Sequence, residues 1–220
     1  MSWDPYLDLQ TGVLRNRLGI TEPKRLRRAE ADFTAVRIAQ VIRSPIPGAY
    51  DLAHLRAFHR QIFQDLYDWA GELRTVSIGR GSRLFSLPQH LEADAGELFG
   101  WLARAEHLRG RDRDTFVDDL TELYADLNAL HPFRDGNGRT QRAFLGQLAV
   151  EAGHPIHWAA MDPAENNAAS KAALDAALFS AGSMAAQWIG WPASTASCPR
   201  NARWVRPLPS RKGCSALRSA

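Results

Sequence analysis

The chain has 220 residues, and its 27 Lys and Arg against 24 Asp and Glu give a formal net charge of +3. The whole excess lies at the end: residues 191–220 carry six basic side chains and no acidic one, which leaves −3 on the first 190 residues. This slightly acidic body argues against a protein that binds nucleic acid over its whole surface. Both cysteines, Cys198 and Cys214, also lie in residues 191–220. The body therefore has no disulfide framework and no cysteine zinc site.

The composition is that of an ordinary globular protein, with 45% hydrophobic and 23% charged residues. No apolar run approaches the roughly 18 residues that a membrane-spanning helix needs. Residues 1–5 lack a basic segment followed by an apolar run, so we expect no secretory signal. We expect a cytoplasmic protein with one domain over residues 1–190 and no contact with a membrane.

Apolar residues recur every three or four positions through most of the body, which predicts amphipathic helices. The clearest stripe is Phe116, Leu120, Leu123, Leu127 and Leu130. The predicted helices cover residues 22–43, 51–67, 87–107, 114–130, 137–152 and 163–180. Short connections between them favour an all-α bundle of antiparallel neighbours.

One segment departs from the helical pattern. Residues 74–78 are rich in β-formers, residues 79–82 form turns readily, and residues 83–85 are again extended in character. This predicts a β-hairpin between two helices, with a decorated loop as the alternative. A lone hairpin is marginal in water, so it must lean on the bundle or on a ligand. Directly after it, Ser86 with Gln89 three residues on predicts the cap of the next helix.

Residues 191–220 are rich in Pro, Ser and Arg and show no periodicity, which predicts a tail that is disordered or weakly docked. Its charge allows contact with nucleic acid or with an acidic partner. A basic tail that is simply solvated is the commoner case.

The densest chemistry lies in residues 131–142, His-Pro-Phe-Arg-Asp-Gly-Asn-Gly-Arg-Thr-Gln-Arg. His131 ends a predicted helix on its apolar side, and Phe133 offers an apolar anchor under a short loop. Gly136, Asn137 and Gly138 then give a backbone free to adopt unusual dihedral angles just before another helix. A glycine-rich loop that leads into a helix N-terminus is typical of an anion site.

Three further residue types complete a phosphate site. Arg139 and Arg142 are three positions apart, so they share one face of the first helical turn and suit a di- or triphosphate. Asp135 supplies a hard oxygen ligand beside the phosphates, as Mg²⁺ requires. His131 is the nearby group suited to accepting a proton at neutral pH.

Each of these residues also has an ordinary structural interpretation. A histidine at a helix end often caps it, Asp before Gly often forms a turn, and arginines at a helix start often pair with surface carboxylates. Together, within twelve residues, they favour a site. The run is not a Walker loop, since no Gly-Lys-Ser/Thr follows, and it does not match a dinucleotide fingerprint.

The run resembles the signature of the Fic domain family, His-Pro-Phe-x-(Asp/Glu)-Gly-Asn-Gly-Arg-x-x-Arg, at every specified position. Residues 68–74 look like the approach to the Fic flap, and residues 5–20 look like the start of the short bacterial Fic toxins. The resemblance covers residues 4 to 190 and implies a Fic-fold helical bundle with a core at about 51–153 and a flap at about 74–86.

The resemblance implies protein adenylylation, in which AMP moves from ATP to a Ser, Thr or Tyr hydroxyl. His131 would be the general base, and Asp135 would hold Mg²⁺ between the α- and β-phosphates. Residues 136–138 would form the nest around the phosphates, which Arg139 would grip, and Arg142 would hold the γ-phosphate.

Two neighbouring features also take roles from the resemblance. An exposed strand at Thr75, Val76, Ser77 and Ile78 would pair with an extended target segment. Gly138 stands where the Doc-like kinase branch has lysine, which favours the AMP-transferring branch. Phosphocholine transfer occurs in the family with a similar motif and stays open.

Regulation and targets are also implied by the resemblance. Many Fic proteins carry a (Ser/Thr)-x-x-x-Glu-(Gly/Asn) helix whose glutamate pairs with the second motif arginine. None of the nine glutamates has Ser or Thr four positions before it, and Glu165, preceded by Met161, comes nearest. A separate small antitoxin would then supply the glutamate, and DNA gyrase or topoisomerase IV subunits are the expected targets.

Two other functions stay open. One is a nucleotide-binding interaction module that has lost catalysis. The presence of both His131 and Asp135 argues against this interpretation. The other is a nucleic-acid binder driven by the tail of residues 191–220.

Overall fold

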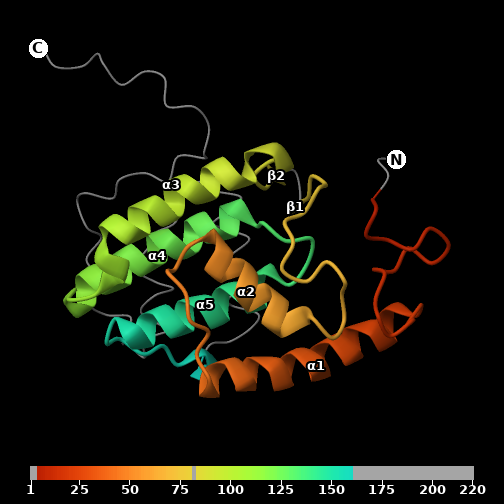
Figure 1. Cartoon of the computed structure of the whole chain (residues 1–220), viewed down its shortest axis with the longest axis horizontal. Coiled ribbons are helices and arrows are strands. Elements are labelled where there is room, and N and C mark those ends of the chain that lie inside the picture. The colour runs from red at the N-terminus through yellow and green to blue at the C-terminus, as the bar shows by residue number, and fades with distance from the viewer. Residues whose placement is uncertain (1–3, 81–82, 161–220) are drawn as a thin grey trace, which may run out of the picture.

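Five α-helices make up most of the chain that the computed structural model describes, which is residues 4–80 and 83–160 (Figure 1). The helices are α1 (Pro23–Arg43), α2 (Leu52–Phe63), α3 (Leu91–Arg104), α4 (Arg113–Leu130) and α5 (Asn137–Glu151). Short 3₁₀ turns occupy Pro88–His90, Glu106–Leu108 and Trp158–Ala160. The predicted helix at 163–180 and the tail of residues 191–220 lie outside the described residues.

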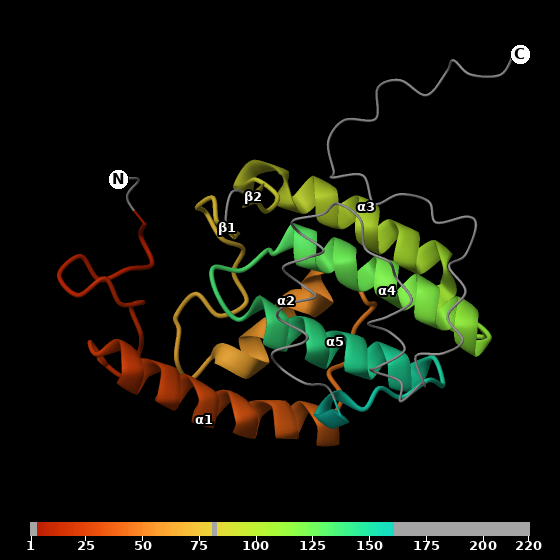
Figure 2. The same ribbon diagram turned by 180° about the vertical axis from the view of Figure 1, so that it is seen from behind.

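The helices pack side by side in an order that the two opposite views both show (Figures 1 and 2). α2 and α5 lie together in the middle, with α1 along one side and α4, followed by α3, on the other. The main core fills the space between α2, α3, α4 and α5, where side chains such as Phe58, Leu127 and Phe144 are fully buried. The predicted all-α bundle is confirmed.

Local signals set most of the helix ends. The Asp51 carboxylate accepts from the His54 N–H at the start of α2, and Asp112 accepts from the Thr115 N–H at the start of α4. The predicted bounds of α1, α4 and α5 agree with the structure to within one residue. α2 ends at Phe63, earlier than predicted.

The predicted cap at Ser86 is wrong. α3 begins only at Leu91, after a 3₁₀ turn, and no side chain caps its start. The Ser86 N–H instead donates to the Ala129 carbonyl at 3.1 Å, so this residue belongs to a contact with the end of α4. A tertiary contact has replaced the local capping signal.

The hairpin exists but its strands are shorter and later than predicted. β1 (Gly79–Arg80) pairs with β2 (Arg83–Leu84) in an antiparallel register, and the Phe85 N–H donates to Ile78. Residues 75–78 are not strand. The Thr75 N–H donates instead to the Tyr6 hydroxyl at 3.1 Å, which draws the first half of the segment away from its predicted partner.

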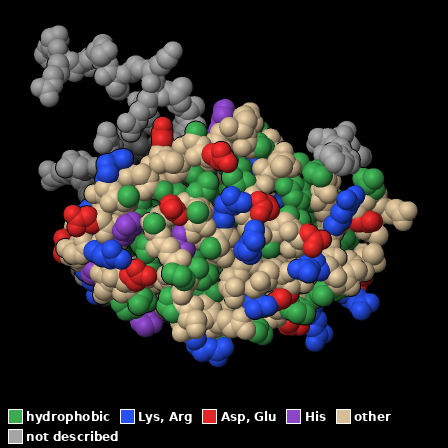
Figure 3. Space-filling model, viewed as in Figure 1, with side chains coloured by type: hydrophobic (Ala, Val, Ile, Leu, Met, Phe, Trp, Pro, Cys, Tyr) green, Lys and Arg blue, Asp and Glu red, His purple; other side chains and the backbone are tan. Residues whose placement is uncertain are grey.

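The surface carries mixed charge. On the face shown in Figure 3, Lys and Arg side chains alternate with Asp and Glu and form no continuous basic area. None of the helices in residues 4–80 and 83–160 is both long and apolar enough to cross a membrane.

Candidate active site

His131 lies at the junction between α4 and the loop that leads into α5. It caps the C-terminus of α4 in a left-handed conformation, with φ at 43°. Its Nδ1 lies 3.2 Å from the Asn128 carbonyl oxygen, which only accepts, so Nδ1 carries the hydrogen of the neutral ring. Burial, with smaller contributions from Arg74 and Arg80, lowers the pKa of His131 to about 4 although the bond to Asn128 opposes the shift. At neutral pH the ring is therefore neutral, with the lone pair on Nε2.

The loop after His131 is closed by its own side chains. The Asn137 amide donates to the Phe133 carbonyl at 2.8 Å and accepts from the Phe133 N–H at 3.0 Å. Gly136 has φ at 79°, and a Cβ at this position would lie 2.2 Å from the Phe63 ring. Glycine is therefore required here, both for the backbone conformation and for the close approach of Phe63.

The start of α5 presents free amides. The first intrahelical bond runs from the Thr140 N–H to the Gly136 carbonyl, and no side chain caps the helix. The N–H groups of Asn137, Gly138 and Arg139 therefore lack helical acceptors and carry the positive end of the helix dipole. The structure thus has the backbone arrangement of an anion site.

Asp135 lies beside these amides. Its Oδ1 accepts from the Gly136 N–H, and its side chain is 44% exposed. Burial and the nearby Glu30 raise the pKa of this carboxyl, whereas Arg139, 3.8 Å away, opposes the shift. Among the described residues no group of three or more His, Cys, Asp or Glu side chains could hold a metal without other ligands.

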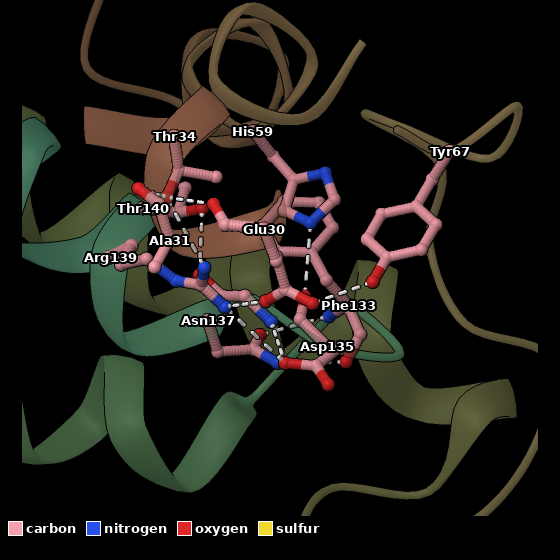
Figure 4. A network of polar contacts seen from close by, with 11 residues as sticks. Glu30, Ala31, Thr34, His59, Tyr67, Phe133, Asp135, Asn137, Arg139 and Thr140 are labelled. Carbon is pink, nitrogen blue, oxygen red and sulfur yellow. Dashed lines mark hydrogen bonds and ion pairs between the residues drawn. The ribbon is translucent and has the colours of Figure 1, made fainter. Parts of the chain in front are cut away.

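Arg139 is tied to α1 by a polar network (Figure 4). Its Nη2 forms an ion pair with Glu30, and its Nη1 donates to the Thr34 hydroxyl at 3.3 Å. The Tyr67 hydroxyl donates to the second Glu30 oxygen at 2.6 Å. The guanidinium also lies over the Phe63 ring, 4.8 Å from its centroid. One buried carboxylate on α1 thus fixes an arginine of the predicted phosphate site.

His59 of α2 packs against the loop and bonds to it (Figure 4). It is fully buried and stacks on Phe133, with ring centroids 3.9 Å apart. Burial lowers its pKa to about 3, so the ring is neutral at neutral pH. Its Nδ1 accepts from the Gly71 N–H at 2.8 Å, and its Nε2 donates to the Asp135 carbonyl at 3.0 Å. Phe133, the predicted anchor, is 1% exposed.

The remaining predicted residues lie at the edges of the site. Arg142 is on the same turn face as Arg139, and a Cβ on Gly138 would lie 3.4 Å from its Nη1. Burial lowers the pKa of Arg142. In the flap, Thr75 and Ser77 are exposed, whereas Val76 and Ile78 are half-buried.

Several residues of this site were not predicted as part of it. The sequence places His59 in an apolar helical stripe, which is a signal for a buried histidine, but nothing local indicates its bond to Asp135. Glu30 and Tyr67 are 109 and 72 positions from Arg139. Their roles arise only when α1 and the segment that follows α2 pack near the start of α5.

Comparisons with known proteins identify the family of the chain. Residues 49–149 match the family model described as Fic/DOC family. The chain is 42% identical over 167 residues to "Protein adenylyltransferase VbhT" of Bartonella schoenbuchensis, covering 76% of this chain and 35% of that protein. It is 38% identical over 168 residues to "Probable protein adenylyltransferase Fic" of Escherichia coli K12, covering 76% of this chain and 83% of that protein. The chain thus spans about a third of the first relative and most of the second.

A solved structure resembles the fold as well. The N-terminal Fic domain of a VirB-translocated Bep effector protein from Bartonella quintana, solved with bound ADP, superposes with a TM-score of 0.73 at 28% identity. The match covers 77% of this chain and 86% of that one. The family signature at residues 131–142 lies at the α4–α5 junction, where the neutral histidine and the free amides meet. The chain belongs to the Fic/DOC family.

Proposed function

We propose that this Fic protein is an adenylyltransferase that transfers AMP from ATP to a Ser, Thr or Tyr hydroxyl of a target protein. Relatives at 38–42% identity that are named protein adenylyltransferases support the reaction class. The solved neighbour with bound ADP supports a nucleotide at this site. The observation that carries the proposal is the neutral His131, with its free Nε2, directly before the open amides of α5.

In the proposed reaction His131 acts as the general base. Its Nε2 takes the proton of the target hydroxyl while that oxygen attacks the α-phosphorus of ATP. The bond between the α-phosphorus and the oxygen bridging to the β-phosphate breaks, and pyrophosphate leaves. A histidine kept neutral by burial holds the correct protonation state throughout the physiological range.

The phosphates would bind at the start of α5. The loop of Gly136, Asn137 and Gly138 would surround them with the free amides of Asn137 and Gly138, and Arg139 and Arg142 would neutralise their charge. The Asn137 side chain has a different task, since both its polar ends are bound to Phe133 and keep the loop closed. Such a preorganised site stabilises developing charge without rearranging.

Asp135 fits a magnesium ion that is shared with the nucleotide. Its carboxylate is partly exposed beside the phosphate loop, and one carboxylate with substrate phosphates and waters is a usual set of Mg²⁺ ligands. When bound, Mg²⁺ would offset the charge on the α- and β-phosphates. Asp135 itself would orient the ion through its bond to the Gly136 amide.

Residues Thr75, Val76, Ser77 and Ile78 would bind an extended segment of the target protein. Two of the four side chains are exposed, and the segment has no strand partner on its outer side among the described residues. Main-chain pairing there would place a hydroxyl near His131.

We further propose that the protein is the toxin of a cytoplasmic toxin–antitoxin pair, with a DNA gyrase or topoisomerase IV subunit as the target. The resemblance to short bacterial Fic toxins supports this role. The lack of the (Ser/Thr)-x-x-x-Glu-(Gly/Asn) motif supports an inhibitory glutamate from a separate antitoxin.

Mass spectrometry of proteins after incubation of a bacterial lysate with ATP and Mg²⁺ tests the proposed activity. The wild type should add an AMP adduct to a target hydroxyl, and His131→Ala should abolish the adduct. An adduct of equal yield with His131→Ala would remove the histidine from its proposed role. A lysate without any adduct, including on the gyrase and topoisomerase IV subunits, would overturn the function.

A further inference from the structure

Arg74 is a buried charged side chain between the flap and the C-terminal end of α4. It is 2% exposed, and its guanidinium donates only to backbone carbonyls. Nε donates to His131 at 2.8 Å, Nη1 to Val76 at 2.9 Å, and Nη2 to Ser86 and to Leu130. No carboxylate within residues 4–80 and 83–160 forms an ion pair with it. A buried charge without a counter-ion is costly unless hydrogen bonds compensate for the lost water, and here backbone carbonyls provide those bonds.

The four carbonyls belong to three separate segments. Val76 lies on the outgoing side of the flap, Ser86 lies on its return, and Leu130 and His131 end α4. Helix ends leave carbonyls without intrahelical donors and favour a positive charge, which Arg74 supplies to α4. Its own N–H donates to the Pro132 carbonyl at 2.9 Å, so both its backbone and its side chain hold the segment that carries His131.

A ring contact joins the same segments. Phe85, the residue before Ser86, stacks on the His131 imidazole with centroids 3.8 Å apart and planes 9° from parallel. The return of the flap therefore covers one face of the proposed base. Arg74 binds the backbone on both sides of this contact, since it holds the carbonyls of Ser86 and of His131.

We propose that Arg74 is a positioning residue that sets the register of the flap relative to His131, so that a hydroxyl on a segment bound at Thr75–Ile78 meets Nε2. This inference rests on the proposed function. Arg74 touches neither nucleotide nor target, since its donors are all directed at backbone oxygens in the interior. Arg74 would act by fixing the distance between the flap, which would bind the target, and the segment that carries His131.

The shape of the guanidinium explains why arginine is needed. Its planar fork presents five N–H donors in fixed directions, whereas the lysine ammonium is a single point with three donors. Arg74→Lys therefore keeps the charge near α4 but does not span carbonyls on three segments. A misplacement of about 1 Å at a reacting centre costs up to about 100-fold in rate.

The test compares Arg74→Lys with wild type in three measurements: the Kd for a non-hydrolysable ATP analogue, kcat/KM for the modified protein target, and amide hydrogen exchange. We expect the nucleotide Kd to stay within about twofold, because the α5 amides do not depend on Arg74. We expect kcat/KM for the target to fall by about 10- to 100-fold. The Phe85 and Ser86 amides, which bond to Ile78 and Ala129, should exchange faster while those of α2 and α5 do not change.

Two further variants complete the test. Arg60→Lys changes an exposed arginine of α2 that pairs with Glu72 and should behave as wild type in all three measurements. Phe85→Leu removes the ring contact with His131 while leaving Arg74 in place. It should lower kcat/KM for the target with an unchanged nucleotide Kd, and it decides the question if Arg74→Lys does not fold.

The outcomes separate the two proposals. Wild-type kcat/KM in Arg74→Lys, or a parallel loss of nucleotide binding in a folded variant, would overturn the positioning role. Unchanged exchange at Phe85 and Ser86 would also overturn it, whether or not the wild type transfers AMP. If the Phe85 and Ser86 amides exchange faster in Arg74→Lys but the wild type transfers no AMP, the connection between the flap and His131 is supported. The proposed function is then overturned.

Discussion

His59 is fully buried and His131 is half-buried, and their partial or complete removal from water lowers the pKa of both, to about 3 and about 4. Their environments give them different tasks. His59 uses both ring nitrogens to join Gly71 to Asp135, whereas His131 uses only Nδ1. Because an unfolded chain would protonate these rings near pH 6.5, it binds more protons than the folded chain below that pH. The free energy of unfolding therefore decreases as the pH falls from about 6.5 towards the folded values.

The low pKa of His131 predicts the pH dependence of AMP transfer. The base is deprotonated throughout the neutral range, so kcat/KM should be flat between about pH 6 and pH 8 and should fall only below about pH 5. The measurement is kcat/KM for the protein target against pH, with tryptophan fluorescence recorded at each pH to show that the protein is folded. A fall centred near pH 6.5 would mean that His131 is more exposed to water in solution than in this structure.

At the residue scale, the contiguous part of the site could be predicted from the sequence and the distant part could not. His131, Asp135 and the glycines lie within one loop, where local chemistry alone indicates an anion site. Arg74 and Glu30 act through bonds to segments far away in the chain. Neither burial of Arg74 nor the pairing of Glu30 has a local signal.

At the scale of elements, α1 is held to the rest of the bundle by two ion pairs of different kinds. Glu30 pairs with Arg139 at the proposed phosphate site, and its side chain is 11% exposed. Arg37 pairs with Asp65 beyond the end of α2, with side chains 26% and 30% exposed. The two pairs lie on the same helix, but only the first touches the site.

This difference predicts a split between stability and nucleotide binding. Glu30→Ala leaves Arg139 and the Tyr67 hydroxyl without their acceptor, and we expect a loss of about 2 kcal/mol in the free energy of unfolding. It should also weaken binding of an ATP analogue by roughly tenfold, because the guanidinium is no longer held beside the α5 amides. Urea unfolding and calorimetric titration measure the two quantities.

Asp65→Ala is the matched control for that variant. It removes the ion pair between Arg37 and Asp65, so it should lower the free energy of unfolding by about 1 kcal/mol and leave nucleotide binding unchanged. Unchanged or tighter nucleotide binding by Glu30→Ala would contradict the role of Glu30 as a support for Arg139.

A helix could be predicted from the sequence where an apolar stripe lies next to a residue that caps the helix. α4 satisfies both conditions, with a stripe from Phe116 to Leu130 and Asp112 at its start. The start of α3 and the strands of the flap could not be predicted in this way. Ser86 bonds to Ala129, and Thr75 bonds to Tyr6, rather than to their sequence neighbours. Tertiary partners decided these two boundaries.

At the scale of the whole molecule, charge is distributed so that the positive groups relevant to function are local. The first 190 residues carry a formal charge of −3, and Figure 3 shows acidic and basic side chains interspersed on one face. The positive potential for phosphates comes from the N-terminus of α5 with Arg139 and Arg142. This local arrangement of positive charge suits a nucleotide substrate.

Transfer of label from ATP to the protein target tests the central claim most directly. ATP labelled at the α-phosphate should label the target in the presence of wild-type protein, whereas ATP labelled at the γ-phosphate should not, because pyrophosphate leaves. His131→Ala should reduce the α-label to background. Incorporation of the γ-label would show phosphate transfer instead and would contradict the proposed adenylylation.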